Sequence, residues 1–233
     1  MKLRDLRSSN PPAAVRAILV GEVILCVAGA AACIWFLMPT RESVLRWYHA
    51  TLALLVAVPI GLNLLHRDRP ADSGLRMDNW RASAREVLLV TVAMTAGIVV
   101  IGLLARGFHW VSLKRLANLV AVYPLWGIAQ QYFLQAFMLR RLRQACIPPP
   151  VAAILAAVLF GLLHAPNWAL VAGVTFTGLV SCTLFIRRPN LFTLGLAHAA
   201  VAVLLFHAWP KAWLQGMTIG PMFLEKARQA GLP

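Results

Sequence analysis

Apolar runs of roughly membrane-spanning length recur along the whole chain, separated by short polar segments. A helix needs about 20 mainly apolar residues to cross the hydrocarbon core of a bilayer. By that criterion the pattern predicts helices over residues 15–38, 46–65, 86–105, 117–138, 150–166, 168–186 and 191–209. Because a backbone inside lipid must satisfy its own hydrogen bonds, we expect an all-α, polytopic helical membrane bundle of about seven to eight transmembrane helices.

The connections between the apolar runs predict a single membrane domain over residues 1–233. The junction at residues 165–167 is short enough for either a tight hairpin or a break buried in the bundle. After Pro210, aromatic residues and methionines alternate with Lys226 and Arg228. This mixture is typical of a segment that lies along the membrane surface, so residues 210–233 are predicted to be an interfacial tail.

Composition supports the membrane interpretation, and the positions of the basic residues explain the high net positive charge. The chain is 60% hydrophobic and 13% charged, with a mean hydropathy of +0.73, whereas soluble domains are about half apolar and about a quarter charged. The net charge of +14 does not indicate a nucleic-acid partner, because the basic residues cluster in the short loops between apolar runs. That placement predicts an integral protein of the plasma (inner) membrane with a cytoplasmic N-terminus, and its loops suit anionic lipid headgroups of the bilayer.

Polar side chains inside three of the apolar runs are the candidates for chemistry, since burying them in hydrocarbon is costly. The first element is Q-Q-Y-F-L-Q, with Gln130, Gln131 and Gln135. On a helix, Gln131 and Gln135 lie one turn apart and share a face. Amides at such positions either bridge helices or form part of a site.

The second and third elements each contain a histidine. Phe160 and His164 stand one helical turn apart in F-G-L-L-H-A-P-N, and Asn167 follows as a candidate site residue or as a cap for the next helix. His198 lies about a turn and a half into the last run, among small or apolar residues. Each histidine alone is compatible with an ordinary buried, hydrogen-bonded residue.

Together the three elements resemble the motifs of the CPBP family, also called the CAAX prenyl protease or Abi family of intramembrane proteases. That family carries E-E-x-x-x-R, F-x-x-x-H and H-x-x-x-N on successive membrane helices, and their order and spacing match a core at about residues 115–205. The resemblance implies an endopeptidase that acts on a membrane-anchored protein or peptide substrate. The site residues that it implies are Gln130, Gln131, Gln135, Phe160, His164, Asn167 and His198.

The departures from the family pattern concern its two glutamates, its arginine and the asparagine of its third motif. Gln130 and Gln131 replace the two glutamates, Gln135 replaces the arginine, and Ala202 replaces the asparagine of the third motif. In the family, the first glutamate is thought to activate a water, while the histidines and the asparagine stabilise the oxyanion or hold a metal. A carboxamide cannot accept the proton of that water. Exchanging an ion pair for neutral amides also lowers the cost of burial.

Other groups are therefore candidates for the base. Glu22 is the only acid well inside a predicted span, which makes it a functional candidate, a partner for Arg16, or a neutral carboxyl. His164 or His198 is itself competent as a base near neutral pH. The pattern identifies no cofactor with certainty, and it leaves a divalent metal open. A divalent metal such as zinc would bind the two histidines and would need Glu22 or water to complete its coordination.

Two functions fit these observations. One is an intramembrane endopeptidase in which water attacks a peptide bond, as the resemblance implies. The other is a catalytically silent relative that binds a membrane segment or peptide, as a chaperone, immunity or assembly factor. A transporter is favoured less, because the sequence has no visible inverted repeats.

Overall fold

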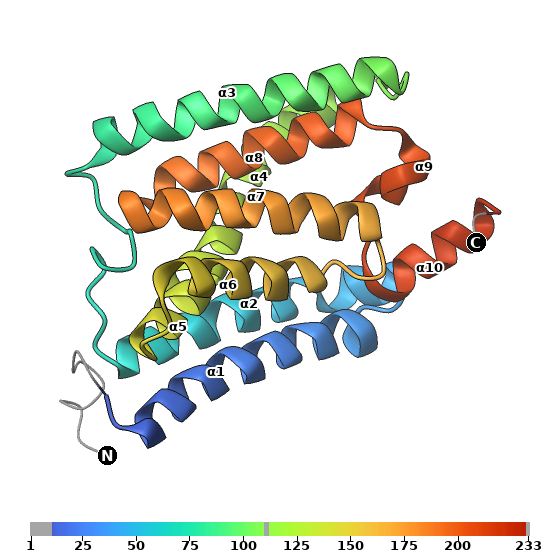
Figure 1. Ribbon diagram of the computed structural model, residues 1–233. Helices are drawn as coiled ribbons and strands as arrows, with labels where there is room; N and C mark the ends of the chain where they lie inside the picture. The colour runs from blue at the N-terminus through green and yellow to red at the C-terminus, as the bar shows by residue number, and fades with distance from the viewer. Residues whose placement is uncertain (1–10, 110–111, 232–233) are drawn as a thin grey trace.

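The computed structural model describes residues 11–109 and 112–231 as a helical bundle (Figure 1). Helices hold 79% of the described residues, which form no strand, so the predicted fold class is confirmed. The main elements are α1 (Ala13–Ala32) with its extension η2 (Cys33–Leu37), α2 (Arg41–Leu65), α3 (Trp80–Leu104), α4 (Leu113–Gln131), η3 (Tyr132–Leu139), α5 (Arg140–Gln144), α6 (Pro149–Leu162), α7 (Trp168–Arg187) and α8 (Leu191–Ala208).

Each predicted apolar run corresponds to a helix of the bundle. Within the part of the chain that the structure describes, four helices are long and apolar enough to cross a membrane, namely Ala13–Leu37, Trp80–Leu104, Trp168–Arg187 and Leu191–Ala208. The number of crossings stays a prediction. The run predicted over 150–166 ends early, at Leu162, because the chain turns there and Asn167 starts the next helix.

The run predicted over 117–138 is part of a longer helical rod formed by α4, η3 and α5. Its middle section, η3, is a π-helix in which every residue is buried. This section contacts α2, α4, α5, α6 and α7 and forms the centre of the bundle. Single π-helical insertions are rare and frequently occur at functional sites. Here the π-helix begins directly after Gln131.

Two pairs of helices pack closely because small residues face each other. In the α4–α8 pair, a Cβ atom added at Gly127 would lie 2.4 Å from the carbonyl oxygen of Gly195. In the α6–α7 pair, a Cβ at Gly161 would lie 2.0 Å from the hydroxyl of Thr175. Small residues at such crossings allow backbones in membranes to approach closely. Both crossings position helices that carry the predicted motifs.

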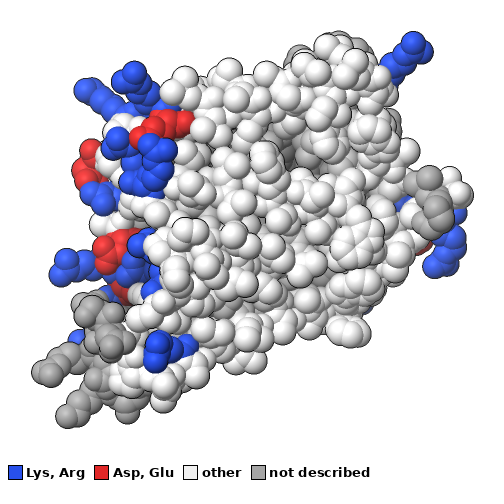
Figure 2. Space-filling view, in the orientation of Figure 1, with Lys and Arg blue, Asp and Glu red and all other residues white. Residues whose placement is uncertain are grey.

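Most of the charged side chains visible in Figure 2 gather at one end of the bundle. This end holds the N-terminal start of α1, the segment between α2 and α3, α5, and the turn between α7 and α8 (Figure 1). Basic connections that are far apart in the sequence thus share one end of the bundle. Which side of the membrane this end faces stays a prediction.

The C-terminal segment folds back onto the opposite end of the bundle (Figure 1). It consists of α9 (Lys211–Leu214), η4 (Gln215–Met217) and α10 (Gly220–Gln229). The Gly220 amide donates to the Ala165 carbonyl at 2.9 Å. Gly220 has a φ of +57°, and a Cβ there would lie 2.7 Å from Cγ2 of Ile34. Glycine therefore suits this contact, which joins the tail to the α6–α7 turn and to η2. The interfacial position of residues 210–233 stays a prediction.

Candidate active site

The first motif and the third motif meet where α4 crosses α8. Gln131 is 2% exposed, and its Nε2 lies 3.0 Å from Nδ1 of His198. An amide N–H can only donate, so Nδ1 of the imidazole accepts this hydrogen bond. The neutral His198 ring then carries its proton on Nε2. It therefore offers a hydrogen-bond donor on the side away from Gln131.

The other two glutamines do not share this contact. Gln130 is half-buried and has no hydrogen-bond partner among the described residues. Gln135 is fully buried inside η3, and neither of its amide atoms has a partner there. The amide oxygen of Gln131 is also without one. Among the described residues, the interhelical bridge that the triplet predicted is thus formed by Gln131 alone.

The second motif forms a local unit at the end of α6. His164 Nδ1 lies 3.1 Å from the carbonyl oxygen of Phe160, and the two rings meet edge to face with centroids 5.5 Å apart. Phe133 of η3 lies beside Phe160, at 6.5 Å between ring centroids. A carbonyl can only accept, so His164 carries its proton on Nδ1 and exposes a lone pair on Nε2. The Phe160 ring thus packs beside the imidazole, as their spacing of one helical turn favours.

The free nitrogens of the two imidazoles thus have opposite hydrogen-bonding roles. His164 presents an acceptor nitrogen and His198 presents a donor nitrogen, and they are close enough to interact electrostatically. The described residues contain no group of three or more His, Cys, Asp or Glu side chains that could hold a metal ion. A zinc ion normally takes three protein ligands even in an open catalytic site. The described donor set does not fit zinc.

Asn167 is fully buried and makes structural contacts. Its side-chain oxygen accepts from the Leu170 amide at 3.2 Å, which caps α7. Its amide nitrogen donates to the carbonyls of Leu214 at 2.9 Å and Thr218 at 3.2 Å, in the C-terminal segment. These contacts match the capping interpretation from the sequence and add a tail contact that the sequence did not indicate. Asn167 therefore fixes the turn that follows His164.

Glu22 is the candidate acid of the first helix, and the structure pairs it with two other residues. One carboxylate oxygen lies 2.7 Å from Nε2 of His66. The other accepts from Nε of Arg141 at 2.9 Å. The sequence proposed Arg16 as a partner for Glu22, whereas Arg141 of α5 takes that role. The carboxylate is therefore engaged in an ion pair.

Arg141 is the centre of a buried polar cluster at the basic end of the bundle. Its guanidinium is fully buried and donates to Asp68 at 2.7 Å, to Gln144 at 2.6 Å and to Asn63 at 2.8 Å. Asp68 also accepts from Arg140 at 2.8 Å. Burial alone would raise the pKa of Asp68, but its hydrogen bonds to Arg140 and Arg141 and their charges lower it below the ordinary value.

This cluster is remote from the paired histidines. Arg141 and Gln131 belong to one helical rod and are separated by ten positions, or roughly 15 Å at 1.5 Å per residue. Glu22, which is bound to Arg141, cannot also reach a water held at His164 and His198. Sequence reasoning did not single out Asp68, His66 or Asn63 as buried residues. The only signal was a pair of arginines directly after an apolar run.

Comparison with known proteins gives one match. Residues 110–204 match the family model described as type II CAAX prenyl endopeptidase Rce1-like. A search of curated proteins and a search of solved structures each found no match. The matched segment covers α4 to α8 almost completely, which are the helices that bear all three motifs. Residues 110–204 of this membrane protein therefore match the Rce1-like model of the CPBP family, as the motifs predicted.

Proposed function

We propose that this protein is an intramembrane endopeptidase in which two histidines replace the lost glutamates. The observation that carries the proposal is that the two rings are different tautomers, with the proton on Nδ1 of His164 and on Nε2 of His198. His164 offers a lone pair on Nε2, because its Nδ1 proton is bound to the Phe160 carbonyl. His198 offers an N–H on Nε2, because its Nδ1 accepts from Gln131. One ring can serve as base while the other binds a carbonyl oxygen.

The reaction that this pair supports is direct attack of water on a peptide bond. The water oxygen bonds to the carbonyl carbon while its proton passes to Nε2 of His164. The carbonyl oxygen gains negative charge and accepts a hydrogen bond from Nε2–H of His198, which stabilises it as an oxyanion-hole donor does. The C–N bond then breaks, and His164 returns the proton to the leaving nitrogen. The products are a carboxylic acid, which ionises, and an amine.

The surrounding residues would position these two groups. Gln131 fixes the tautomer of His198, because the hydrogen bond at one ring nitrogen decides which nitrogen carries the proton. Phe160 holds the ring of His164 through its carbonyl and its edge-to-face contact. Gln130 is half-buried and has no described partner, so its amide is free to hold the attacking water. We assign Gln135 and Asn167 to support of the helices rather than to contact with substrate.

The substrate that the site implies is a peptide segment of a membrane-anchored protein. The apolar helices that carry the histidines favour a target that reaches the site within or beside the bilayer. We place the protein in the plasma (inner) membrane with its basic end in the cytoplasm, following the distribution of Lys and Arg.

The test compares the termini of membrane proteins in cells that carry wild type, His164→Ala, His198→Ala, or no copy of the protein. We expect termini that occur only with wild type, since loss of a general base or of an oxyanion donor lowers rates by about a hundredfold or more. Leu162→Ala is the matched control, because this side chain lies two residues from His164 but is 47% exposed. Identical termini in all strains would contradict the proposal.

A catalytically silent function is the second candidate, and a different observation favours it. Glutamines replace both glutamates of the first motif, and Glu22 is engaged by Arg141 and His66. On this alternative the donor of His198 binds a peptide carbonyl without hydrolysis. Wild type would then produce no new termini but would still cross-link to a membrane segment, and Gln130→Glu would start cleavage by supplying a carboxylate base. Gln130→Asn is the control for that change.

A further inference from the structure

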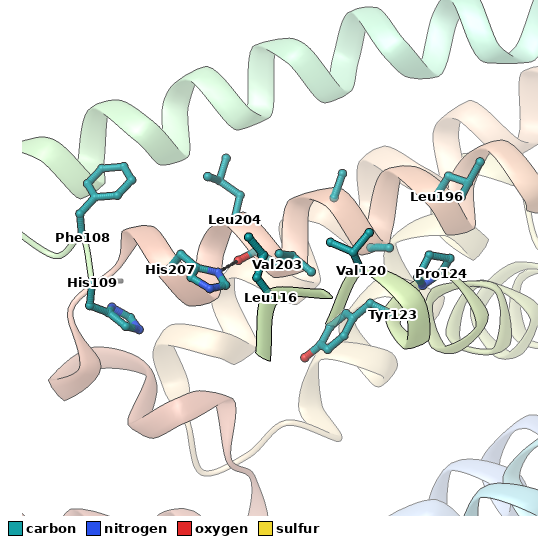
Figure 3. A pocket seen from close by; sticks show the side chains of 12 residues that line it. Phe108, His109, Leu116, Val120, Tyr123, Pro124, Leu196, Val203, Leu204 and His207 are labelled. Carbon is teal, nitrogen blue, oxygen red and sulfur yellow. Dashed lines mark hydrogen bonds between the residues drawn. The ribbon is translucent and has the colours of Figure 1, made fainter. Parts of the chain in front are cut away.

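A cavity lies toward the end of the bundle opposite the basic loops, and its lining includes Ala199, which follows His198 in the chain. It occupies about 550 Å³ between α4, α8 and the segment that follows α3 (Figure 3). Pockets of about 300–1,000 Å³ are typical of small-molecule sites. Its lining does not include His164, Gln131 or His198. The residues that line it are Phe108, His109, Leu116, Val120, Tyr123, Pro124, Leu196, Ala199, Ala200, Val203, Leu204 and His207.

The walls of this cavity are almost entirely apolar and continue onto the outer surface of the bundle. Val120 of α4 is 58% exposed and Leu196 of α8 is 46% exposed, although both also line the cavity. In a membrane these surfaces face lipid. A molecule dissolved in the bilayer can therefore enter from the side without crossing water.

The polar groups of the cavity come from Tyr123 and from two imidazoles, which lie at the end that Phe108 borders (Figure 3). His207 Nδ1 lies 2.6 Å from the Val203 carbonyl, and His109 Nδ1 lies 3.2 Å from the Gly107 carbonyl. Both carbonyls can only accept, so both rings carry their protons on Nδ1 and have lone pairs on Nε2. The rings lie nearly parallel, at 20° and 6.0 Å between centroids.

One of these lone pairs lacks a partner. Nε2 of His207 is buried and has no hydrogen-bond partner among the described residues. A buried polar atom without a partner is destabilising, and in native structures it usually indicates a missing water or ligand. Because the nitrogen is an acceptor, the group that satisfies it must be a donor.

We propose that this cavity binds a lipid alcohol, with its apolar chain between α4 and α8 and its hydroxyl donating to Nε2 of His207. A neutral hydroxyl is the donor that costs least to bury, whereas an ammonium or a carboxylate would bring a charge into an apolar space. A carboxylate would in addition face the lone pairs of two imidazoles. The site is independent of the proposed peptidase chemistry, because it shares no residue with it.

Photolabelling of the full-length protein in detergent micelles tests this proposal. The probe is dodecanol that carries a diazirine at the far end of its chain, and the matched probe is its methyl ether, which cannot donate. We expect the alcohol to label residues of α4 and α8 about fivefold more strongly than the ether, as for one net hydrogen bond. Unlabelled dodecanol should compete. Equal labelling by both probes would overturn recognition of the hydroxyl.

Substitutions inside and outside the cavity test whether the alcohol binds there. Ala200→Phe should fill the cavity and abolish labelling, and His207→Leu should reduce alcohol labelling to that of the ether. The control is Leu125→Phe, because Leu125 lies on α4 at 73% exposure and does not line the cavity. Labelling that is equal in Ala200→Phe and Leu125→Phe would overturn the cavity as the binding site. The comparison of alcohol with ether on wild type decides the proposal even if a variant fails to fold.

Discussion

Gln135 shows that the three glutamines of the first motif have different roles. Gln131 holds His198, whereas Gln135 is fully buried and both of its amide atoms lack partners among the described residues. Leaving a buried polar group unpaired costs about 1–3 kcal/mol. Gln135 therefore stands at the position of the family's arginine as a neutral residue, and its unpaired amide lowers the stability of the fold.

We predict that Gln135→Met raises the stability of the protein by about 1–3 kcal/mol, because an apolar side chain of similar size removes the unpaired amide. Thermal unfolding in detergent, followed by circular dichroism, measures the change. Gln131→Met is the matched control and should destabilise, because it breaks the hydrogen bond to His198. A loss of stability in Gln135→Met would mean that a water or ligand pairs with this amide.

At this same scale, the sequence predicted some contacts of the motif residues but not others. The spacing of Phe160 and His164 predicted their contact, because residues four apart share a helical face. No spacing rule indicates that Gln131 rather than Gln130 reaches His198, since that depends on how α4 is rotated against α8. The π-helical section after Gln131 changes the rotation of everything that follows it, and the sequence carries no signal for it.

Among the elements, the α4–α8 crossing is the one that determines the geometry of the site. Gly127 and Gly195 allow the two backbones to meet one turn before Gln131 and one turn before His198. The hydrogen bond between Gln131 and His198 thus depends on an approach that a single methyl group would prevent.

We predict that Gly127→Ala separates α4 from α8 and weakens cleavage by about tenfold or more, because a Cβ would lie 2.4 Å from the Gly195 carbonyl oxygen and small shifts of catalytic groups are costly. The appearance of wild-type-dependent termini measures the effect. Gly173→Ala is the control, since a Cβ there meets nothing within 4 Å. Equal effects of the two changes would contradict a specific role for the crossing.

The positions of the helices were the most predictable part of the structure. Apolar runs define where helices form in a membrane, and the predicted run 191–209 differs from the helix Leu191–Ala208 by a single residue. The end of the run 150–166 was wrong because Ala165 and Pro166 are apolar yet belong to a turn. Hydropathy measures the apolar length of a segment, whereas capping by Asn167 decides where the helix begins again.

For the molecule as a whole, the buried cluster around Arg141 joins segments that are far apart in the sequence. Glu22, Asn63 and Asp68 all hydrogen-bond to this guanidinium. Breaking a buried ion pair costs about 3–5 kcal/mol, because the remaining charge is left uncompensated. The sequence offered no way to foresee this cluster, since its partners lie on separate elements and meet only after the bundle forms.

We predict that Asp68→Asn lowers the free energy of unfolding by about 3 kcal/mol at neutral pH, because Arg141 then loses one of its two carboxylates. Thermal or chemical unfolding in detergent measures it. Asp78→Asn is the control, since Asp78 is exposed and pairs with Arg76 at the surface. Similar stabilities of the two variants would contradict a central role for the cluster.

The ion pair between Asp68 and Arg141 also predicts how the free energy of unfolding depends on pH. The pKa of Asp68 is lowered below its ordinary value of 3.8 in the folded protein, so the unfolded chain binds its proton first as the pH falls. The stabilisation from Asp68 is therefore complete above pH 3.8 and disappears as the pH falls through the lower folded pKa. Unfolding of wild type and Asp68→Asn along this range should converge at acid pH. A constant difference between them would contradict the assignment.

The cluster also crosses the boundary of the segment that matches the family model. The family match begins at residue 110, yet Arg141 inside it is neutralised by Glu22 and Asp68 outside it. A fragment cut at the boundary of the match would retain a buried cation and lose both of its counterions. Segments outside the match, namely α1 and the connection between α2 and α3, therefore supply both counterions of a cation that is buried in the matched segment.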